Sequence, residues 1–408
     1  MKTGDPELMR EINRFHILDL VRRHGPISRV EICSRADLSS TTVSAITGAL
    51  IEDGIIEPVS IGGIHEPTRG RPRVMLQLNP EAARVVGLRV GPHGILVAVT
   101  NFRGDVLASL ELPVRVRRQP VPVVADLAED AVRRAVVEAG LTLDDIDSVC
   151  ASLPGMVEYG TGLVRVSPIF SARDTTFGGA LSSRLGVPTI VESDANALAL
   201  AEHWFGSCRD TADFAVVSLE QAIGLGILHG GQLFRGVHGL SHDIGSMVLG
   251  TRPDGSLLRL VDLASENAVL AGFEADPMLR DATSAGLGLR HAVDRLARVG
   301  AGGAEAVAVR GVVERAGRAI GIAVANVVTL FAPPRIVLSG SLLHLGDCLV
   351  EAIHRGFEEA VAEPLARSVA ITVDPPRDAA RLGQGAAAVA LCELYGSPWN
   401  TTGPVRPA

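Results

Sequence analysis

Hydroxyl and guanidinium groups are concentrated in two short stretches near the N-terminus of the chain. Residues 39–44 read SSTTVS, and residues 69–73 read RGRPR. Serine and threonine hydroxyls can hydrogen-bond to DNA base edges, and arginines on an extended loop can follow phosphates or enter a narrow minor groove. We therefore predict a DNA interface formed by Arg29, Arg35, Ser39, Ser40, Thr41, Thr42, Ser44, Arg69, Arg71 and Arg73.

Two short helices are expected to carry these hydroxyls. Ser28 and Glu31 have the spacing of a capping box for a first helix that ends near residue 36, and Ser39 can cap a second helix. The second helix has an apolar stripe on one face and hydroxyls on the other. The stripe is Val43, Ile46 and Leu50, and the hydroxyls are Ser40, Thr41, Ser44 and Thr47. A helix-turn-helix fits this pattern, and an ordinary helical hairpin fits it equally well.

The flanking segments favour the DNA-binding alternative. Residues 6–24 have helical spacing of apolar side chains and stop at Gly25-Pro26, which predicts a third helix. Strand patterns at residues 55–56 and 74–78 enclose the glycine- and arginine-rich stretch, as in a hairpin. Three helices and a hairpin make a winged helix-turn-helix over residues 1–80, although the wing arginines could also form a solvated basic loop.

Composition excludes several classes of protein. The 408 residues are 47% hydrophobic and 21% charged, which is typical of folded domains, and the net charge of −8 means that any DNA contact must be local. Lys2 is the only lysine, so a Walker-type loop, a Schiff base and a pyridoxal cofactor are all excluded. The five cysteines form no CxxC pair. The sequence shows no signal peptide and no membrane span, so we expect a cytoplasmic protein. We also expect no cofactor.

The remainder of the chain has the pattern of an α/β domain. After Asn79-Pro80, β-branched runs separated by glycine turns predict a three-stranded meander, followed by a helix at residues 121–139. A second meander begins at Phe214 and is followed by a long helix at about residues 307–330. Two such units suggest two related lobes with a cleft between them, and clefts of this kind hold small ligands.

From about residue 10 to residue 394 the chain resembles the ROK family of repressors and sugar kinases. The matching segments read GPISRVEICSRADLSSTTVS, GRPRVMLQLNP, LPGMVE, SDANALALAEHWFG, IGLGI, GVHGLSHDIGSM and ANVVTLFAPPRIVLSG. The resemblance implies a winged helix-turn-helix at residues 1–80 and an actin-like, RNase-H-like domain at residues 81–400, assembled as a homodimer or homotetramer. Lobe I would comprise about residues 81–195 plus the helix at 379–394, and lobe II about residues 196–378.

This sequence departs from ROK kinases at both phosphate loops. The aspartate and threonine of the DxGxT loop correspond to Arg89 and His93, and Pro92 between them offers no backbone N–H. A second glycine-rich loop is replaced by Glu220 and its neighbours, and a carboxylate repels phosphate by roughly 1 to 4 kcal/mol at contact distance. We therefore expect no kinase activity. Gly224 of the second loop remains. Close packing of strands explains a glycine there as readily as phosphate binding does.

The resemblance also bears on metal and sugar sites. The histidine and cysteines of the family zinc site are missing, so no metal is expected. Part of the sugar pocket remains, and the resemblance assigns effector binding to Gly155, Ser193, Asp194, Asn196, Asp243 and Ser246. Asp194 corresponds to the catalytic base of the kinases, although it could equally cap a helix. His242 replaces a glycine and could narrow the pocket.

The sequence thus predicts a transcriptional regulator, a repressor of operator DNA that responds to a sugar or sugar derivative. ROK recognition helices often carry a basic residue where this chain has Ala45, and residues 39–50 contain none. We therefore expect the wing and indirect readout to carry more of the specificity. The alternatives are an ATP-dependent sugar kinase with an appended DNA-binding domain, and a constitutive DNA binder with a vestigial body.

Overall fold

The computed structural model describes residues 6–59, 74–236, 239–277, 279, 289, 293, 303–374 and 379–396. Its N-terminal part contains three helices and a small antiparallel sheet in the order β1-β3-β2. The predicted winged helix-turn-helix is therefore confirmed, with one additional strand, β1. The elements are α1 (Pro6–His24), β1 (Ile27–Ser28), α2 (Arg29–Ala36), α3 (Ser40–Glu52), β2 (Ile56–Val59) and β3 (Met75–Leu78).

The helix ends of this domain follow the predicted caps. The Ser28 side chain accepts a hydrogen bond from the Glu31 backbone N–H, and the Glu31 carboxylate accepts one from the Ser28 N–H at 2.9 Å. α2 ends at Ala36, where Asp37 takes a left-handed conformation. Ser39 caps α3 by accepting from the Thr42 N–H at 3.1 Å. Local hydrogen bonding therefore fixes the two helices and the turn between them.

The first sheet of the body has the strand order β10-β7-β4-β5-β6. Its antiparallel meander comprises β4 (Arg84–Gly91), β5 (Gly94–Asn101) and β6 (Val106–Leu112), and the strands parallel to β4 on the other side are β7 (Ser148–Leu153) and β10 (Thr189–Ser193). Alternate residues of β4 point to opposite faces, so Val86 and Leu88 pack with α4 (Val121–Glu138) and Val85 packs with α14 (Ala379–Leu394).

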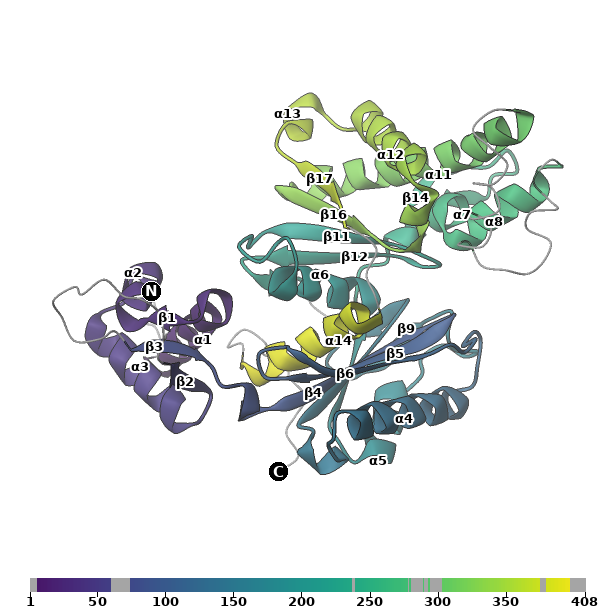
Figure 1. Ribbon diagram of the computed structural model, residues 1–408. Coiled ribbons are helices and arrows are strands. Elements are labelled where there is room, and N and C mark those ends of the chain that lie inside the picture. The colour runs from purple at the N-terminus through teal and green to yellow at the C-terminus, as the bar shows by residue number, and fades with distance from the viewer. Residues whose placement is uncertain are drawn as a thin grey trace.

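The second sheet repeats the strand order of the first, which explains the two related lobes seen in the sequence. Its meander is β11 (Phe214–Leu219), β12 (Ile223–His229) and β13 (Gln232–Leu233), and the parallel strands beside β11 are β16 (Arg335–Ser339) and β17 (Ala370–Val373). The outer face packs against α11 (Ala304–Phe331) and α12 (Asp347–Ala360). Both lobes lie one above the other in Figure 1.

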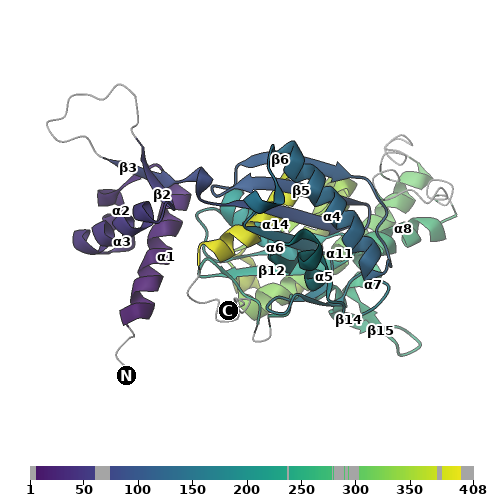
Figure 2. The same ribbon diagram turned by 90° about the horizontal axis from the view of Figure 1, so that it is seen from below.

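Two helices lie between the sheets, as Figures 1 and 2 show. α6 (Asp194–Phe205) packs on β12 and α14 packs on the first sheet, and the two helices contact each other. A Cβ at Gly87 of β4 would come within 2.0 Å of the Gly383 carbonyl oxygen of α14, so glycine is required for this approach. Gly224 has a similar role, because its Cβ would meet Ala195 of α6 at 2.8 Å. It therefore serves helix-to-strand packing and not the strand-to-strand packing that we expected.

Smaller elements complete the lobes. They include two-stranded sheets, β8 with β9 and β14 with β15, and several short helices. These elements, which the sequence did not predict, are β8 (Met156–Glu158), β9 (Leu163–Val166), α5 (Phe177–Leu185), β14 (Val248–Thr251), β15 (Leu257–Arg259), α7 (Leu260–Ala264), α8 (Glu266–Ala275) and α13 (Glu363–Ala366), with 3-10 turns at Pro80–Ala82, Leu143–Asp145, Ile244–Ser246 and Ser341–Leu345.

The winged helix-turn-helix packs against the body through a shared core. Apolar residues of α1, including Val21, belong to one buried cluster with Trp204 of α6 and Tyr395 after α14. The guanidinium of Arg22 lies 4.6 Å from the centroid of the Trp204 ring, a cation–π contact. Arg209 adds a hydrogen bond of 2.8 Å from its Nη2 to the Arg22 carbonyl oxygen. α6 therefore extends from the interior of the body to the DNA-binding domain.

Candidate functional site

The outer face of α3 presents hydroxyl groups to solvent. Ser40, Thr41 and Ser44 are exposed, while Val43 and Leu50 on the opposite face are completely buried. The hydroxyls of Ser39 and Thr42 lie 2.8 Å apart and bond to each other. The groups on this helix that can reach base edges without breaking an internal bond are therefore Ser40, Thr41 and Ser44.

Thr47 is the exception to the predicted hydroxyl face, because it is fully buried. Its Oγ1 donates to the Val43 carbonyl oxygen at 2.8 Å and accepts from Nε of Arg29 at 2.8 Å. The placement of Thr47 on the outer face was therefore wrong. The bond links α3 to the start of α2 and holds the stem of Arg29, whose terminal nitrogens have no protein partner among the described residues and can contact a phosphate.

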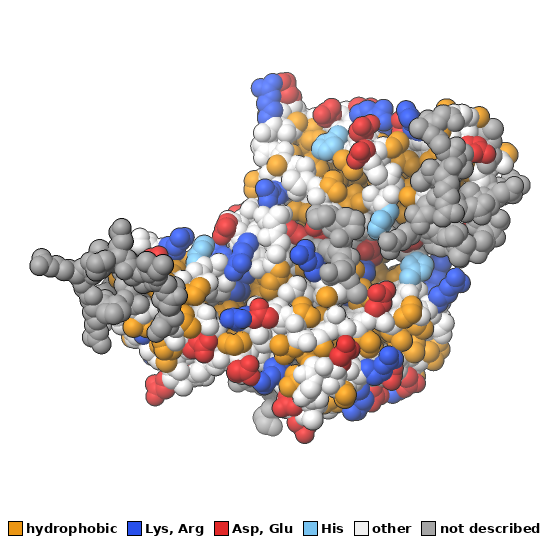
Figure 3. Space-filling model, in the orientation of Figure 1, with side chains coloured by type: hydrophobic (Ala, Val, Ile, Leu, Met, Phe, Trp, Pro, Cys, Tyr) orange, Lys and Arg blue, Asp and Glu red, His pale blue; other side chains and the backbone are white. Residues whose placement is uncertain are grey.

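The other predicted DNA contacts divide into described and undescribed residues. Arg35 is exposed in the last turn of α2. Strands β2 and β3 form the base of the wing, with Ile56 paired to Leu78. Arg69, Arg71 and Arg73 lie outside the described residues, so their contribution stays a prediction. In Figure 3 the visible face of the body mixes basic and acidic side chains without one continuous basic area.

At the cleft between the lobes, Arg89 forms an ion cluster with two carboxylates. Its Nη2 lies 3.0 Å from Oδ2 of Asp194 at the start of α6 and 2.5 Å from Oε2 of Glu220 after β11. The three side chains are 12%, 5% and 18% exposed. Arg89, which we expect in place of the phosphate-loop aspartate, is thus bonded both to Asp194, expected at the position of the kinase base, and to Glu220, expected in the second phosphate loop.

Burial and charge act against each other in this cluster. Burial alone would lower the pKa of Arg89, but Asp194 and Glu220 outweigh it, so that pKa is raised and the guanidinium stays charged. Burial, with a further contribution from repulsion by Asp194, raises the pKa of Glu220 and outweighs the opposing effect of Arg89. One cation therefore stabilises two carboxylates in a water-poor site, and its removal would leave both unpaired.

The predicted effector residues only partly surround one hollow. Gly155, Ser193 and Asp194 line it, together with Glu220 and His242. Its volume is about 20 Å³, which has room for one water molecule and not for a sugar ring. Oδ1 of Asp194 has no hydrogen-bond partner within the described part of the chain.

The remaining predicted effector residues are placed differently. Asn196 is completely buried, and its Nδ2 donates to Oε1 of Glu192 at 2.9 Å. Asp243 and Ser246 are exposed and bond to each other at 2.6 Å, outside the lining of the hollow. Helix α6 is capped by Ser193, which accepts from the Asn196 N–H at 3.3 Å. The alternative role of Asp194 as a helix cap is therefore wrong.

A larger cleft of about 320 Å³ lies on the other side of Arg89. His93 projects into it, with its Nε2 3.2 Å from Nε2 of Gln221 and 3.7 Å from Oε1 of Glu266. The nearby Glu266 carboxylate raises the pKa of His93 against the effect of burial. The described lining is Arg89, Gly91, Pro92, His93, Gly94, Leu96, Glu111, Glu220, Gln221, Glu266, Leu289, Ser341 and His344. Three carboxylates make this cleft unfavourable for a triphosphate.

The sequence did not indicate a buried ion pair that adjoins Asn196 through Glu192. Arg235 lies 3.8 Å from the centroid of the Tyr159 ring, and its Nε donates to Oε2 of Glu192 at 2.8 Å. These side chains come from separate segments, so no spacing in the sequence connects them. Within the described residues there is no group of three or more His, Cys, Asp or Glu side chains that could hold a metal ion, and no helix there could cross a membrane.

Comparisons with known proteins agree with this architecture. The ROK family profile matches residues 85–393, and a profile for winged helix-turn-helix DNA-binding domains matches residues 10–57. A xylose repressor from Caldicellulosiruptor bescii is 25% identical over 361 residues, which cover 86% of this chain and 88% of that protein. The DNA-binding transcriptional dual regulator NagC from Escherichia coli K12 is 26% identical over 362 residues, covering 86% of this chain and 85% of NagC.

Solved structures give the same fold for both domains. A ROK family transcriptional regulator that is a homologue of the E. coli MLC protein has a TM-score of 0.75 at 22% identity, covering 94% of this chain and 97% of that chain. A ROK hexokinase from Thermus thermophilus has a TM-score of 0.57 at 26% identity, covering 76% of this chain and 99% of the enzyme. The chain therefore belongs to the ROK family, with a winged helix-turn-helix at its N-terminus.

Proposed function

We propose that this ROK protein is a DNA-binding transcriptional repressor whose body has lost kinase activity. The observation that carries the proposal is the ion cluster of Arg89 with Asp194 and Glu220. A carboxylate bonded to a buried arginine is a weak proton acceptor, and the same arginine fills the place of the metal-orienting aspartate. The repressor and regulator functions of the relatives named above support the same conclusion.

DNA recognition follows from the exposed face of α3. Ser40, Thr41 and Ser44 read base edges, while Arg29, Arg35 and the wing arginines contact phosphates. Serine and threonine discriminate bases less sharply than a bidentate arginine does, so the wing contributes a large share of the affinity. The protein acts as a homodimer or homotetramer, with half-sites one helical turn, or a multiple of it, apart.

The operator should be selected from random DNA and then used to compare two sets of variants. Replacing Arg69, Arg71 and Arg73 with alanine should weaken binding at least as much as replacing Thr41 and Ser44. Each lost phosphate contact should also lower the slope of log affinity against log salt concentration by about 1. Fluorescence anisotropy of a labelled operator at several salt concentrations measures both quantities. A wing variant that binds like the wild type would contradict the proposed role of the wing.

The effector is a sugar or sugar derivative bound near Asp194, with Gly155, Ser193, Asn196, Asp243 and Ser246 at the edges of a site that widens when the lobes open. Xylose and N-acetylglucosamine, from the names of related repressors, are the first probes. A thermal-shift series with these sugars and with ATP and magnesium tests the proposal. We expect stabilisation by a sugar, none by ATP, and no phosphorylated sugar.

The series also separates the alternatives. Sugar phosphorylation that is abolished by Asp194→Asn would favour a kinase with an appended DNA-binding domain. Sugar affinity that is equal with and without operator would favour a constitutive DNA binder, because coupling between two sites must be reciprocal.

We also propose domain boundaries at residues 1–80 and 81–400, with lobe I at about 81–195 plus 379–394 and lobe II at about 196–378. The packing of α14 on the first sheet supports this division.

A further inference from the structure

The junction between the winged helix-turn-helix and the body encloses a cleft of about 420 Å³. This volume lies within the range of small-molecule sites, which occur preferentially between domains. α1 and β3 supply one wall, and the loop after β5, the end of α6 and α14 supply the other. The described lining is Val21, Arg22, Gly25, Pro26, Gln77, Leu78, Arg103, Gly104, Asp105, Trp204, Phe205, Arg209 and Gln384.

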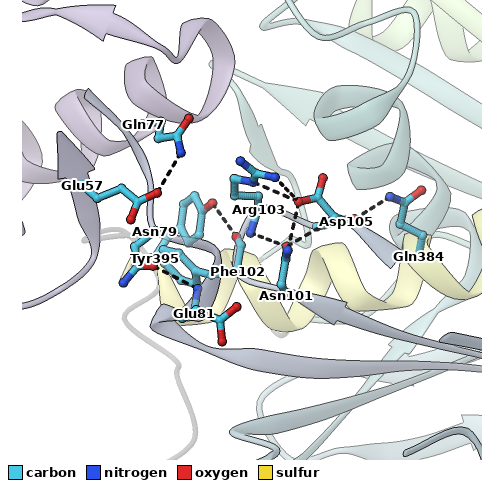
Figure 4. A network of polar contacts seen from close by, with 11 residues as sticks. Glu57, Gln77, Asn79, Glu81, Asn101, Phe102, Arg103, Asp105, Gln384 and Tyr395 are labelled. Carbon is cyan, nitrogen blue, oxygen red and sulfur yellow. Dashed lines mark hydrogen bonds and ion pairs between the residues drawn. The ribbon is translucent and has the colours of Figure 1, made fainter. Parts of the chain in front are cut away.

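Polar groups from both domains converge on this cleft, as Figure 4 shows for several of them. Gln77 of β3 lies on the DNA-binding side, with its Nε2 bonded to Glu57 at 2.8 Å. On the body side, Arg103 is held by Asp105, and Gln384 donates from Nε2 to the Gly104 carbonyl oxygen at 2.7 Å. Trp204 and Phe205 add an aromatic wall. A ligand in the cleft would therefore touch both domains at once.

The charges around the cleft are unbalanced toward positive. Arg22, Arg103 and Arg209 line the cleft, and Asp105 is the one carboxylate among its described lining residues. Asp105 pairs with Arg103, and Asp19, which lies outside the lining, pairs with Arg22. Arg209 has no carboxylate within ion-pair distance among the described residues. Arginine forks match carboxylate and phosphate oxygens in bidentate geometry, so the excess charge suits an anion.

A buried group at the same place supports this charge count. Arg22 is only 7% exposed, and its Nη1 has no hydrogen-bond partner among the described residues. Buried donors of this kind are rare in native proteins and call for an explanation. In addition, burial and then the charge of Arg22 lower the pKa of His203 to about 4, against the opposing effect of Asp19. The cluster therefore carries more positive charge than its own carboxylates neutralise.

We propose that the cleft between the two domains binds a small metabolite that carries a carboxylate or phosphate group, with Arg209 and Arg103 as its charge partners. The aromatic wall of Trp204 and Phe205 would pack against the uncharged part of that ligand. The site is separate from the pocket at Asp194, at the opposite end of α6, and the proposal does not depend on a sugar effector.

Trp204 supplies a built-in probe for the experiment. The chain has two tryptophans, Trp204 and Trp399, so the full-length Trp399→Phe protein reports on Trp204 alone. Its fluorescence should be titrated with citrate, with glucose 6-phosphate, and with glucose as the neutral comparison, at constant ionic strength of about 0.15 M. We expect a saturable change with at least one anion and none with glucose, and the citrate and phosphate arms identify which group is preferred.

Substitutions then locate the binding. Arg209→Gln removes an exposed charge that, among the described residues, makes one bond, to the Arg22 carbonyl oxygen, and should weaken the affinity by about tenfold. Arg103→Gln should weaken it as well, while Arg367→Gln, an exposed arginine beside α13, should leave it unchanged. The proposal is overturned if neither anion gives a saturable change, if glucose gives the same change, or if Arg209→Gln titrates like the parent protein.

Discussion

The two ends of α6 differ in the ratio of carboxylates to arginines. At the first residue of the helix, Arg89 is shared by Asp194 and Glu220, and the hollow beside them measures about 20 Å³. Near the last residue, Asp19 is shared by Arg22 and Arg23, next to a cleft of about 420 Å³. Carboxylates thus outnumber the arginine at the Asp194 end, and arginines outnumber the carboxylate at the Trp204 end.

At the Asp194 end, the residues that we propose in place of the kinase groups bind one another, and these bonds contribute to stability. The junction with the added domain has no counterpart in a protein that lacks that domain. The proposed anion site would lie where the two domains meet, at the opposite end of α6 from Asp194.

The largest expected effect is at the Asp194 end of α6. Arg89→Ala should lower the free energy of unfolding by about 3–5 kcal/mol, because it leaves two buried carboxylates without a cation. Urea denaturation at neutral pH, followed by circular dichroism, measures the loss. At pH 5 the loss should shrink, because the carboxylates can then take up a proton. A loss below about 1 kcal/mol at neutral pH would show that the cluster is not structural.

The next largest effect is at the Trp204 end of α6, where the free energy of unfolding should depend on pH. The pKa of His203 is about 4 in the folded protein and about 6.5 in an unfolded chain. Well above pH 6.5, His203 is unprotonated in both states, and its contribution to stability is fully present. Between pH 6.5 and 4 the unfolded state takes up the proton first, so stability falls by roughly 3 kcal/mol.

His203→Asn should remove most of that slope, because asparagine does not titrate and can keep the bond that Nδ1 of His203 makes with the Cys208 carbonyl oxygen. The measurement is the free energy of unfolding of both proteins at several pH values between 4 and 7. Burial also lowers the pKa of His24 and His242, so the test is the difference between variant and wild type. Parallel pH curves would contradict the prediction.

The smallest effect is expected for Asp194→Asn, again at the Asp194 end of α6. The substitution removes one of two carboxylates that share a single arginine, and Glu220 remains to pair with Arg89. The free energy of unfolding should therefore change by about 1 kcal/mol or less. Thermal and urea unfolding of the variant beside Arg89→Ala measure the contrast. A loss as large as that of Arg89→Ala would mean that Asp194, and not Glu220, carries the stabilising ion pair.

Local signals in the sequence predicted the elements and their caps. The ROK resemblance, the winged helix-turn-helix and the regulator function are confirmed by the family profiles and the relatives.

For Thr47 the helical spacing in the sequence was correct, but it was misinterpreted. It stands four residues after Val43, so helical spacing places it on the buried stripe. The error came from treating a polar side chain as an exposed one, although its hydroxyl bonds Arg29 and the backbone.

By itself the sequence allowed the prediction that Arg89, His93 and Glu220 stand in the phosphate loops of the family, because they lie within recognisable motifs. Only the tertiary structure decided that Arg89 binds Asp194 and Glu220, which are 105 and 131 residues away. The cleft at Arg22 and Arg209 likewise appears only when α1 packs against the end of α6. Helix caps and turns depend on neighbours in the chain, whereas ion pairs and clefts depend on how distant segments pack.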